Sequence, residues 1–507
     1  WLNNMSDWLI SKKNRYWGLS LPIWKCSDCD QVEVIGGKEE LKMKATEGWD
    51  KFEGKTPHKP YVDQVKLDCP CGGQMSRVED VGNPWLDAGI VPFSTITEPD
   101  KEQLSYTSDK KYWRKWFPAD FITESFPGQF KNWFYSLIAM STVLENTNSF
   151  ENVLGFATVL DEKGEEMHKS AGNAIAFGEA ADKMGVDVMR WLYTKQNPQR
   201  NLLFGYKKAD EIRRQFLMIL WHSYRFFANY AAIEDWKPQD DVQPSTLDDW
   251  IRARLDQTIN IAEKSLNDFD AFTASQAIEA FVSDLSTWYI RRSRSKIGPN
   301  VEDSPEKQAA NQTLHSVLVD LSRILMPFMP FISEQIYTNL TGHESVNLAD
   351  WPKVKPLKQE QLQLIEDMKL VREIVELGRA RRNKKDIPLR QPLAKISVYG
   401  PVEHLKDQKA LLQLIKEELN IEKVDIDKAK ELKVKLDTEL TERLKQKGEA
   451  RKVIREIQKA RKKAQTDFDA QIVIELPDWP KQFEDEIKSQ AQVKEIRKGE
   501  EVKIIKS

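Results

Sequence analysis

The sequence predicts three consecutive parts: an α/β region, an α-helical bundle and a small α/β appendage. Up to about residue 201, aromatic-rich segments and short apolar runs alternate with turns, as in an α/β domain. After residue 205, apolar residues recur at steps of three and four, which is the period of an amphipathic helix. Beyond about residue 390, stretches of alternating Ile, Val and Leu lie between charged helical segments. No internal repeat is apparent.

Length and composition indicate a large globular protein. A chain of 507 residues should divide into three or four domains. Its 40% hydrophobic and 31% charged residues are typical of a soluble protein. The sequence has no apolar run long enough to span a bilayer and no stretch that resembles a signal peptide. We therefore expect a cytoplasmic protein without a membrane partner.

The α/β region should end in a strand, a polar loop and two short helices. Residues 152–160 are typical of a buried strand, and the polar stretch 161–175 follows. We expect helices over 177–184, closed by a glycine, and over 187–194. Within the loop, Met167-His168-Lys169-Ser170 suggests phosphate binding, because a lysine on a flexible loop is a positionable cation. An ordinary surface lysine is the alternative.

The bundle is indicated by two apolar helix faces and by their end signals. The first face contains Ile278, Phe281, Val282, Leu285, Trp288 and Tyr289. The second contains Leu314, Val317, Leu318, Leu321, Ile324, Leu325 and Phe328. Ser245–Asp249 offers a capped start for a long helix, and Pro327 and Pro330 should end or kink the last one. Helices of this length joined by short loops form a bundle.

The four cysteines all precede residue 72, as two closely spaced pairs. Cys26 and Cys29 form the first pair, and Cys69 and Cys71 form the second. Two tight turns that each supply two thiolates suit a structural zinc ribbon, and the glycines after the second pair provide the permissive backbone. The second pair is one residue shorter than the usual spacing. Reduced, scattered thiols of a cytoplasmic protein are the alternative.

Net charge is only −3, yet basic residues cluster in three places. These are residues 291–296, 379–385 and 450–463. Each is a candidate phosphate-contacting face, and the alternative for each is a solvated helix surface. Three clusters in the carboxy-terminal two thirds favour a polyanionic partner.

Several segments match known motifs in order along the chain. They are "DWLISKKNRYWGLSLPIW" from Asp7, "GNPWLDAGIVPF" from Gly82, "PADFITESFPGQFKNWFYSL" from Pro118, "EMHKSAGN" from Glu166, and the helical segments 220–230, 284–294, 325–337, 376–393 and 435–464. Together they resemble the class I aminoacyl-tRNA synthetases, most closely the isoleucyl branch. The first resembles the return from the editing insertion, the second the WFDSG element, the third the aminoacyl-adenylate strand and helix, and the fourth the KMSKS loop.

The resemblance implies three domains. Residues 1–205 would be the carboxy-terminal half of a Rossmann-type class I catalytic domain, with a zinc-ribbon-like insert at 24–76 and the KMSKS-type loop at 165–173. Residues 206–360 would form the helical anticodon-binding domain. Residues 361–507 would form a carboxy-terminal helix and a small α/β tRNA-binding region.

The resemblance also implies a reaction: ATP activates isoleucine as an adenylate, and the aminoacyl group then passes to tRNA(Ile). Lys169 and Ser170 would act on the phosphates, with Mg²⁺ accompanying ATP. The implied nucleotide loop comprises Met167, His168, Lys169, Ser170, Gly172 and Asn173. The implied adenylate pocket comprises Glu124, Gln129, Trp85 and Asp87. The implied zinc ligands are Cys26, Cys29, Cys69 and Cys71, and the candidate tRNA contacts are Arg291, Arg292, Arg294, Arg381 and Arg382. We expect a monomer.

The sequence departs from the family pattern at several positions. Glu166 replaces the first lysine of the loop and His168 replaces a serine, while Phe156-Ala157 stands where a histidine-glycine pair is usual. The HIGH motif and the editing insertion are absent. We therefore expect a portion of a longer ligase that is inactive without an amino-terminal half. The alternatives are a non-catalytic tRNA-binding fragment, and a related ligase for valine or another amino acid.

Overall fold

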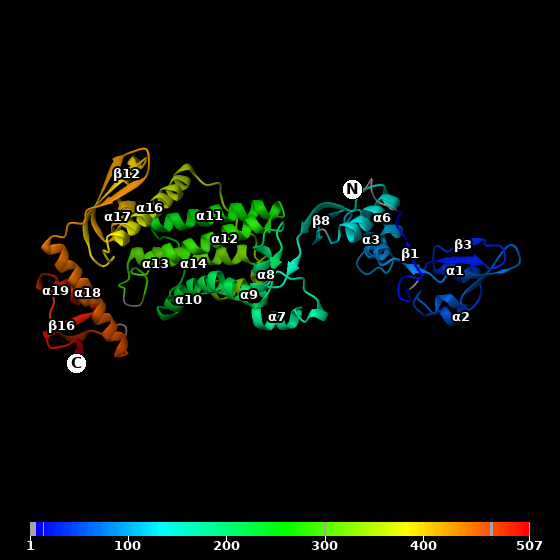
Figure 1. Cartoon of the computed structure of the whole chain (residues 1–507), viewed down its shortest axis with the longest axis horizontal. Helices are drawn as coiled ribbons and strands as arrows, with labels where there is room; N and C mark the ends of the chain where they lie inside the picture. Colours follow the sequence, from blue (N-terminus) through cyan, green and yellow to red (C-terminus); the bar gives the residue numbers. More distant parts are fainter. Residues whose placement is uncertain (1–6, 14, 127, 299–300, 467–469, 506–507) are drawn as a thin grey trace. The chain divides into compact units, whose positions relative to one another are not determined.

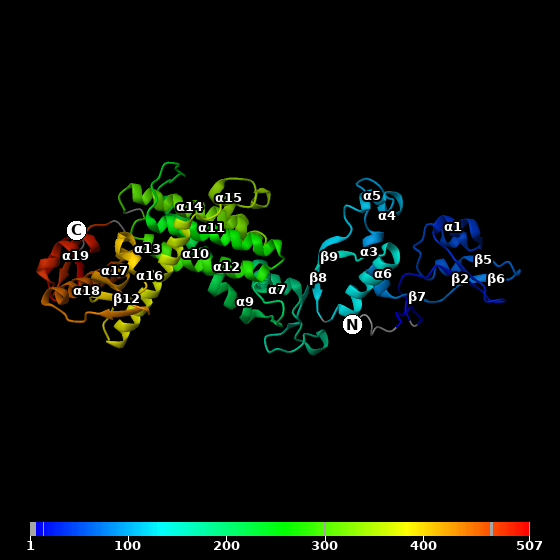
Figure 2. The same cartoon turned by 90° about the horizontal axis from the view of Figure 1, so that it is seen from above.

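The computed structural model describes residues 7–13, 15–126, 128–298, 301–466 and 470–505. The chain forms two compact units, which are described separately (Figures 1 and 2). The first unit contains residues 1–173 and 197–203, and the second contains 174–196 and 204–507. Among the described residues, the helices are all too short or too polar to cross a membrane.

The first unit begins with a small antiparallel sheet that holds the cysteines. Its strand order is β3-β2-β6-β5-β4. The bounds are β2 Ile23–Cys26, β3 Val32–Val34, β4 Ala45–Glu47, β5 Lys66–Asp68 and β6 Gln74–Arg77, with helices α1 Lys38–Lys44 and α2 Trp49–Phe52. Trp24 is buried against this sheet, and its indole N–H donates to the carbonyl of Val65. The insert therefore has an apolar core of its own.

Helices α3 and α6, with the two short helices α4 and α5 between them in the chain, form the next part of the first unit. The bounds are α3 Pro84–Ser94, α4 Ser105–Ser108, α5 Lys110–Trp113 and α6 Tyr135–Glu145, and β1 Ser11–Lys12 pairs with β7 Val81–Gly82. Asn83 caps α3 by accepting from the N–H of Trp85, and Pro84 occupies the first turn. A Cβ at Gly89 would lie 2.5 Å from the carbonyl oxygen of Ser136 on α6, so only glycine permits this close crossing.

Two parallel strand pairs complete the first unit. β8 Ala119–Ser125 pairs with β9 Phe150–Phe156, and β10 Val159–Leu160 pairs with β11 Leu202–Leu203. The strand expected over 152–160 is therefore divided between β9 and β10. The division falls at Ala157, whose N–H donates to the carbonyl of Pro198 and not to β8. Across the ranges of β8 and β9, every residue is at least partly exposed.

The second unit contains the expected helical bundle. Its bounds are α7 Phe177–Met184, α8 Val186–Thr194, α9 Tyr206–Ile212, α10 Met218–Ile233, α11 Thr246–Asn267, α12 Ala271–Asp284, α13 Arg291–Ser293, α14 Pro305–Leu325, α15 Pro330–Thr341 and α16 Gln359–Lys384. The end signals are confirmed: Ser245 caps α11 in a capping box, Gly185 ends α7, and α15 begins at Pro330.

Helix α8 is tied to the bundle although it precedes residue 205 in the chain. The Asp187 carboxylate accepts from the N–H groups of Phe331 and Ile332 at the start of α15. These are N–H groups that a helix cannot satisfy itself, and a carboxylate there also interacts favourably with the helix dipole. The Arg190 guanidinium donates to the carbonyls of Pro327 and Phe328. Two side chains of α8 thus hold the turn between α14 and α15.

The carboxy-terminal part of the second unit contains one arrangement twice. Each copy is a long helix, a strand, a helix, a parallel strand and an antiparallel strand, with the first strand in the centre of its sheet. The first copy is α16, β12 Leu393–Gly400, α17 Lys409–Leu419, β13 Ile421–Lys428 and β14 Lys433–Leu436. The second is α18 Glu442–Lys463, β15 Ile472–Leu476, α19 Glu484–Ala491, β16 Val493–Lys498 and β17 Lys503–Ile505.

A buried arginine occupies the same place in each copy. Arg382 donates to the carbonyls of Gln391 and Asn420, the latter just before the parallel strand β13. Arg461 donates in the same way to the carbonyls of Ala470 and Gln492, the latter just before β16. The expectation of no internal repeat was therefore wrong. The repeat is carried by topology and by a few buried contacts, and it leaves little mark on the amino-acid letters.

We predict that Arg382→Met destabilises the first copy by about 2–4 kcal/mol, because carbonyls of Pro388, Gln391 and Asn420 lose their donor. The opening free energy of β12, measured by amide hydrogen exchange, reports this change. Arg381→Met on the exposed side of the same helix is the control, with an expected effect within about 0.5 kcal/mol. Equal effects of the two substitutions would contradict the assignment.

Candidate functional site

The polar loop after β10 is a compact turn organised by two side chains. The Asp161 carboxylate accepts from the N–H groups of Lys163 and Glu165, at 2.8 and 3.0 Å. The Asn173 side chain accepts from the N–H of His168 and donates to Asp161 Oδ2 and the carbonyl of Glu166. The Glu165 N–H, followed by the Asn173 amide, lowers the pKa of the Asp161 carboxyl. The two ends of the loop are thereby held together.

The residues predicted to meet phosphate lie at the tip of this loop. Lys169 and Ser170 are exposed and begin a short 3₁₀ turn, which ends at Gly172 with φ of +72°. Within the part of the chain that the structure describes, no carboxylate pairs with the Lys169 ammonium. Met167 is half-buried, and the His168 ring lies 3.3 Å from the Glu166 carboxylate. The one unpaired cation of the tip is therefore free to meet an external anion.

Glu124 lies at the carboxyl end of the parallel strand pair. It is opposite Gly155 in the register of β8 and β9, and its Oε1 accepts from the N–H of Ser125 at 2.7 Å. The family-variant pair Phe156-Ala157 ends β9, and the chain continues through β10 directly into the loop. Glu124 is the penultimate residue of β8, and the Lys169 loop follows β10, so both lie at the carboxyl ends of parallel strands. Ligands bind at such ends in open α/β sheets.

The other predicted pocket residues come from the neighbouring helix α3 and the π-helical turn Phe130–Phe134, which packs against it. Trp85 and Asp87 lie on α3, and Gln129 precedes the turn. Burial raises the pKa of the Asp87 carboxyl. Among the described residues, Asp87 Oδ1 and Gln129 Oε1 are buried and have no hydrogen-bond partner. Buried polar atoms normally have a hydrogen-bond partner, so these two acceptors are candidate ligand contacts.

The four cysteines converge in the small antiparallel sheet. Their sulfur atoms all lie within 4.8 Å of one another, with Cys26 and Cys71 at 3.6 Å and Cys29 and Cys69 at 3.6 Å. The N–H of Asp28 points at Cys26 Sγ, and this hydrogen bond is the main cause that lowers the pKa of Cys26 to about 7. A Cβ at Gly73 would lie 3.0 Å from the same sulfur. The donor set and its spacing fit a tetrahedral zinc ion.

Comparison with known proteins assigns the family. The family described as "tRNA synthetases class I (I, L, M and V)" matches residues 1–204, and "Anticodon-binding domain of tRNA ligase" matches residues 248–398. Isoleucine–tRNA ligase of Dehalococcoides mccartyi is 37% identical over 446 residues, which cover 84% of this chain and 42% of that protein. The chain belongs to the class I tRNA synthetases.

Other comparisons agree with this family. Isoleucine–tRNA ligase of Thermus thermophilus is 37% identical over 439 residues, covering 84% of this chain and 41% of that protein. The synthetase chain thus spans less than half the length of these curated relatives. A solved structure described as the ternary complex of Agrobacterium radiobacter K84 agnB2 LeuRS-tRNA-LeuAMS has the same fold, with a TM-score of 0.52 and 19% identity, covering 71% of this chain and 44% of that one.

The arginines predicted to contact tRNA differ in their surroundings in this synthetase chain. Arg291 and Arg292 pair with the buried carboxylate of Glu418, at 2.8 and 2.9 Å. Arg294 is exposed and lies over the ring of Phe226, and Arg381 is exposed. Arg382 is buried and donates to three backbone carbonyls. A guanidinium held in this way does not reach a phosphate, so Arg382 is not retained among the proposed contacts.

The roles of two residues of the synthetase chain were not predicted from the sequence. Asp161 organises the loop, and the turn "DEKG" was the signal that such a residue was present. Glu418 collects arginines from distant elements, because Arg379 also pairs with it. The helical spacing was the available signal for Glu418, because it follows Leu411 by seven residues and Ile415 by three, on the buried face of α17.

We predict that Asn173→Ala opens the loop, because its side chain joins three backbone or side-chain groups of the loop. Trypsin should then cleave after Lys169 several-fold faster, as measured by mass spectrometry of timed digests. Ser170→Ala, which removes an exposed hydroxyl of the same loop, should leave the rate unchanged. Unchanged cleavage in Asn173→Ala would show that this side chain does not order the loop.

Proposed function

We propose that this chain forms the rear half of an isoleucine–tRNA ligase, which activates isoleucine with ATP and transfers it to tRNA(Ile). The names of its relatives suggest the amino acid. The observation that carries the proposal is the unpaired Lys169 at the tip of the hydrogen-bonded loop that follows β10. The proposed domains are the predicted ones, residues 1–205, 206–360 and 361–507.

The loop has the chemistry that phosphoryl transfer requires. Charge builds up on the departing pyrophosphate, and a positioned cation stabilises it without covalent chemistry. Lys169 supplies that cation in our proposal, and Ser170 donates a hydrogen bond to a phosphate oxygen. Gly172, in a left-handed conformation, allows the chain to turn at the base of the tip. Mg²⁺ bound with ATP would neutralise further phosphate charge.

The pocket beside α3 would receive the amino acid and the adenylate. The unpartnered oxygens of Asp87 and Gln129 are acceptors, which suits an ammonium group or sugar hydroxyls. Glu124 would face the same ligand from the end of β8. Trp85, half-buried on the first turn of α3, would form an apolar wall. These roles follow from residue chemistry and from the family resemblance.

The strand pair β8–β9 supports a partner that completes the catalytic domain. Parallel sheets are normally covered on both faces, whereas Val153 in the middle of β9 is 51% exposed. Further strands and helices would cover this pair, and we propose that they come from the amino-terminal half of the same ligase. That half would also supply the HIGH motif, the other side of the nucleotide site.

We further propose that Cys26, Cys29, Cys69 and Cys71 hold a structural zinc ion. Its binding would contribute directly to the folding of the insert, because the insert's own apolar core is small. For tRNA, the exposed Arg294 and Arg381 are the favoured contacts. Arg291 is 45% exposed and can exchange its ion pair for a phosphate, whereas Arg292 is mostly enclosed by Glu417 and Glu418.

We predict that Lys169→Ala in the assembled ligase slows adenylate formation about 100-fold, because one cation on the transition state is lost. Isoleucine-dependent ATP–pyrophosphate exchange measures this step. The affinity for tRNA should stay nearly unchanged, and Lys163→Ala in the same loop is the control. Equal losses of exchange and of tRNA binding would mean that Lys169 has only a structural role. If exchange depended on valine and not on isoleucine, the proposed amino acid would be wrong and valine would be the substrate.

We predict about one zinc ion per chain in freshly purified protein, measured by elemental analysis. Chelation should increase hydrogen exchange in residues 24–76 and leave the bundle unchanged, because each unit has its own core. Cys29→Ser should lower the zinc content, while Ser27→Ala, on a neighbouring exposed residue, should not. Absence of zinc from the wild-type protein would rule out the site.

A further inference from the structure

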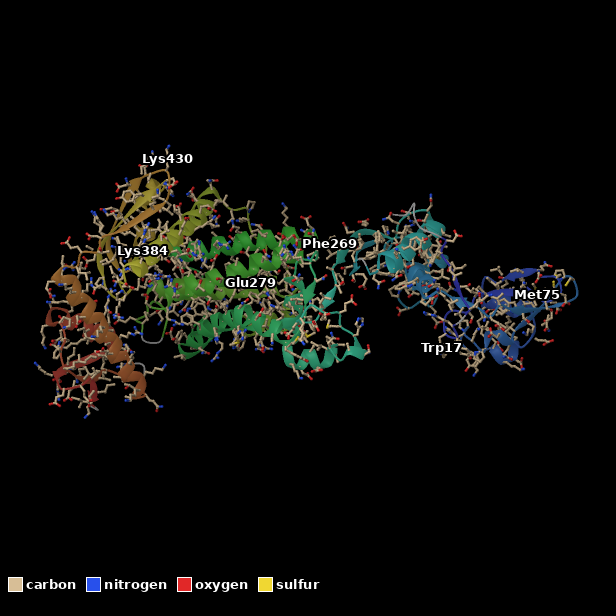
Figure 3. All side chains as sticks on the ribbon, viewed as in Figure 1. Trp17, Met75, Phe269, Glu279, Lys384 and Lys430 are labelled. Carbon is tan, nitrogen blue, oxygen red and sulfur yellow. The ribbon has the colours of Figure 1, made fainter. Side chains whose placement is uncertain are left out.

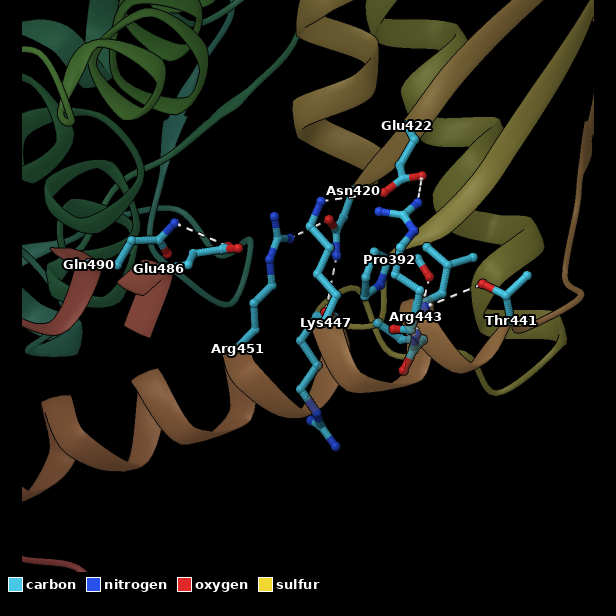
Figure 4. Close-up of polar contacts among 12 residues, drawn as sticks. Pro392, Asn420, Glu422, Thr441, Arg443, Lys447, Arg451, Glu486 and Gln490 are labelled. Carbon is cyan, nitrogen blue, oxygen red and sulfur yellow. Dashed lines mark hydrogen bonds and ion pairs between the residues drawn. The ribbon is translucent and has the colours of Figure 1, made fainter. Parts of the chain in front are cut away.

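Helix α18 of the second copy carries basic residues on two separate lines. The first, which we call the inner stripe, contains Arg443, Lys447 and Arg451. Figure 4 shows these side chains directed at the first copy. Arg443 and Lys447 both contact the Glu422 carboxylate, and Arg451 donates to Asn420 Oδ1. The inner stripe therefore has partners within the chain and joins the two copies.

The second line, which we call the outer stripe, contains Lys452, Arg455, Lys459, Lys462 and Lys463. Their spacing of three, four, three and one places them along one side of the helix, over about 16 Å. All are exposed. In the ranges that the structure describes, none of them has an ion pair or a hydrogen-bonded carboxylate, although ion pairs of other lysines and arginines are frequent there. The helix thus has one neutralised basic stripe and one that is not.

The first copy shows that the fold does not require these charges. Counted from the equivalent arginines Arg461 and Arg382, Lys452 corresponds to Glu373 and Arg455 to Glu376. Both glutamates are exposed. The register is supported by burial, because Leu444, Ala450 and Val453 of α18 correspond to Ile365, Val371 and Ile374 of α16, and all six are buried. At these two positions the same scaffold therefore carries acidic residues in one copy and basic residues in the other. The remaining stripe residues Lys459, Lys462 and Lys463 correspond to Ala380, Asn383 and Lys384.

We propose that the outer stripe binds the phosphate backbone of RNA, and specifically the tRNA of the proposed function, on which this identification rests. A row of unpaired cations at helical spacing complements a polyanion. A membrane surface fits less well, because a helix that lies on a bilayer needs an exposed apolar face. The apolar residues of α18, including Val453 and Ile457, are buried in the core of the second copy.

The test uses the whole chain and replaces two stripe residues by their first-copy counterparts, as Lys452→Glu with Arg455→Glu. The control is Lys353→Glu with Lys355→Glu, which changes the net charge equally at exposed lysines before α16. The probe is a fluorescent tRNA transcript with an isoleucine anticodon, titrated at several salt concentrations. Circular dichroism and thermal unfolding check that both variants fold. We expect the stripe variant to fold, because glutamates occupy the equivalent positions of the first copy.

The stripe variant should bind the transcript at least tenfold more weakly near 0.1 M salt. Its plot of log affinity against log salt should become less steep, by about 1.5–2 in the slope, because fewer phosphate contacts are made. The control should stay within twofold. Wild-type affinity in the stripe variant, or equal weakening in both, would overturn the proposal. Isoleucine-dependent exchange by the assembled wild-type ligase tests the proposed function separately, so tRNA binding through the stripe without exchange would reject only the latter.

Discussion

Both faces of parallel strands normally pack against other elements, so the parallel strand pair β8–β9 constrains how the first unit is arranged. Glu124 lies near the carboxyl end of β8, and β9 leads through β10 into the loop that carries Lys169. Helices α3 and α6 cross closely at Gly89, which brings Asp87 and the turn after Gln129 into one layer. Parallel sheets are normally covered on both faces, whereas every residue of β8 and β9 is at least partly exposed. This exposure supports our proposal that further protein completes the site.

In the second unit, two small sheets are attached to a long helical bundle. Each small sheet is fastened to its preceding helix by one buried arginine, which reaches the carbonyl where the parallel strand begins. Glu418 joins the first copy to the bundle through Arg291 and Arg292, and it also pairs with Arg379 on α16 of its own copy. The inner stripe joins the second copy to the first. Several basic residues at these junctions thus pair with carboxylates of the chain itself. Figure 3 draws the side chains of the chain, with Lys384 and Lys430 of the first copy labelled.

The sequence predicted the features that depend on local pattern. The capping box at Ser245 and the stop at Gly185 were confirmed, because capping depends on a few adjacent residues. The convergence of the cysteines agrees with their spacing. Contacts between distant residues were not predictable, so Arg382 looked like a surface cation in a basic run although it is buried. The repeat was not predicted for the same reason. Its two copies share topology and buried contacts, and at two equivalent exposed positions they have opposite charges.

The central claim is that Lys169 and its loop form half of a nucleotide site that requires a second part. The most direct measurement is isoleucine-dependent ATP–pyrophosphate exchange, made with the purified chain alone and after mixing with the separately produced amino-terminal half of the ligase. The account predicts background exchange by the chain alone and clear exchange by the mixture. Exchange above background by the chain alone, or none by a mixture that forms a stable complex, would contradict it.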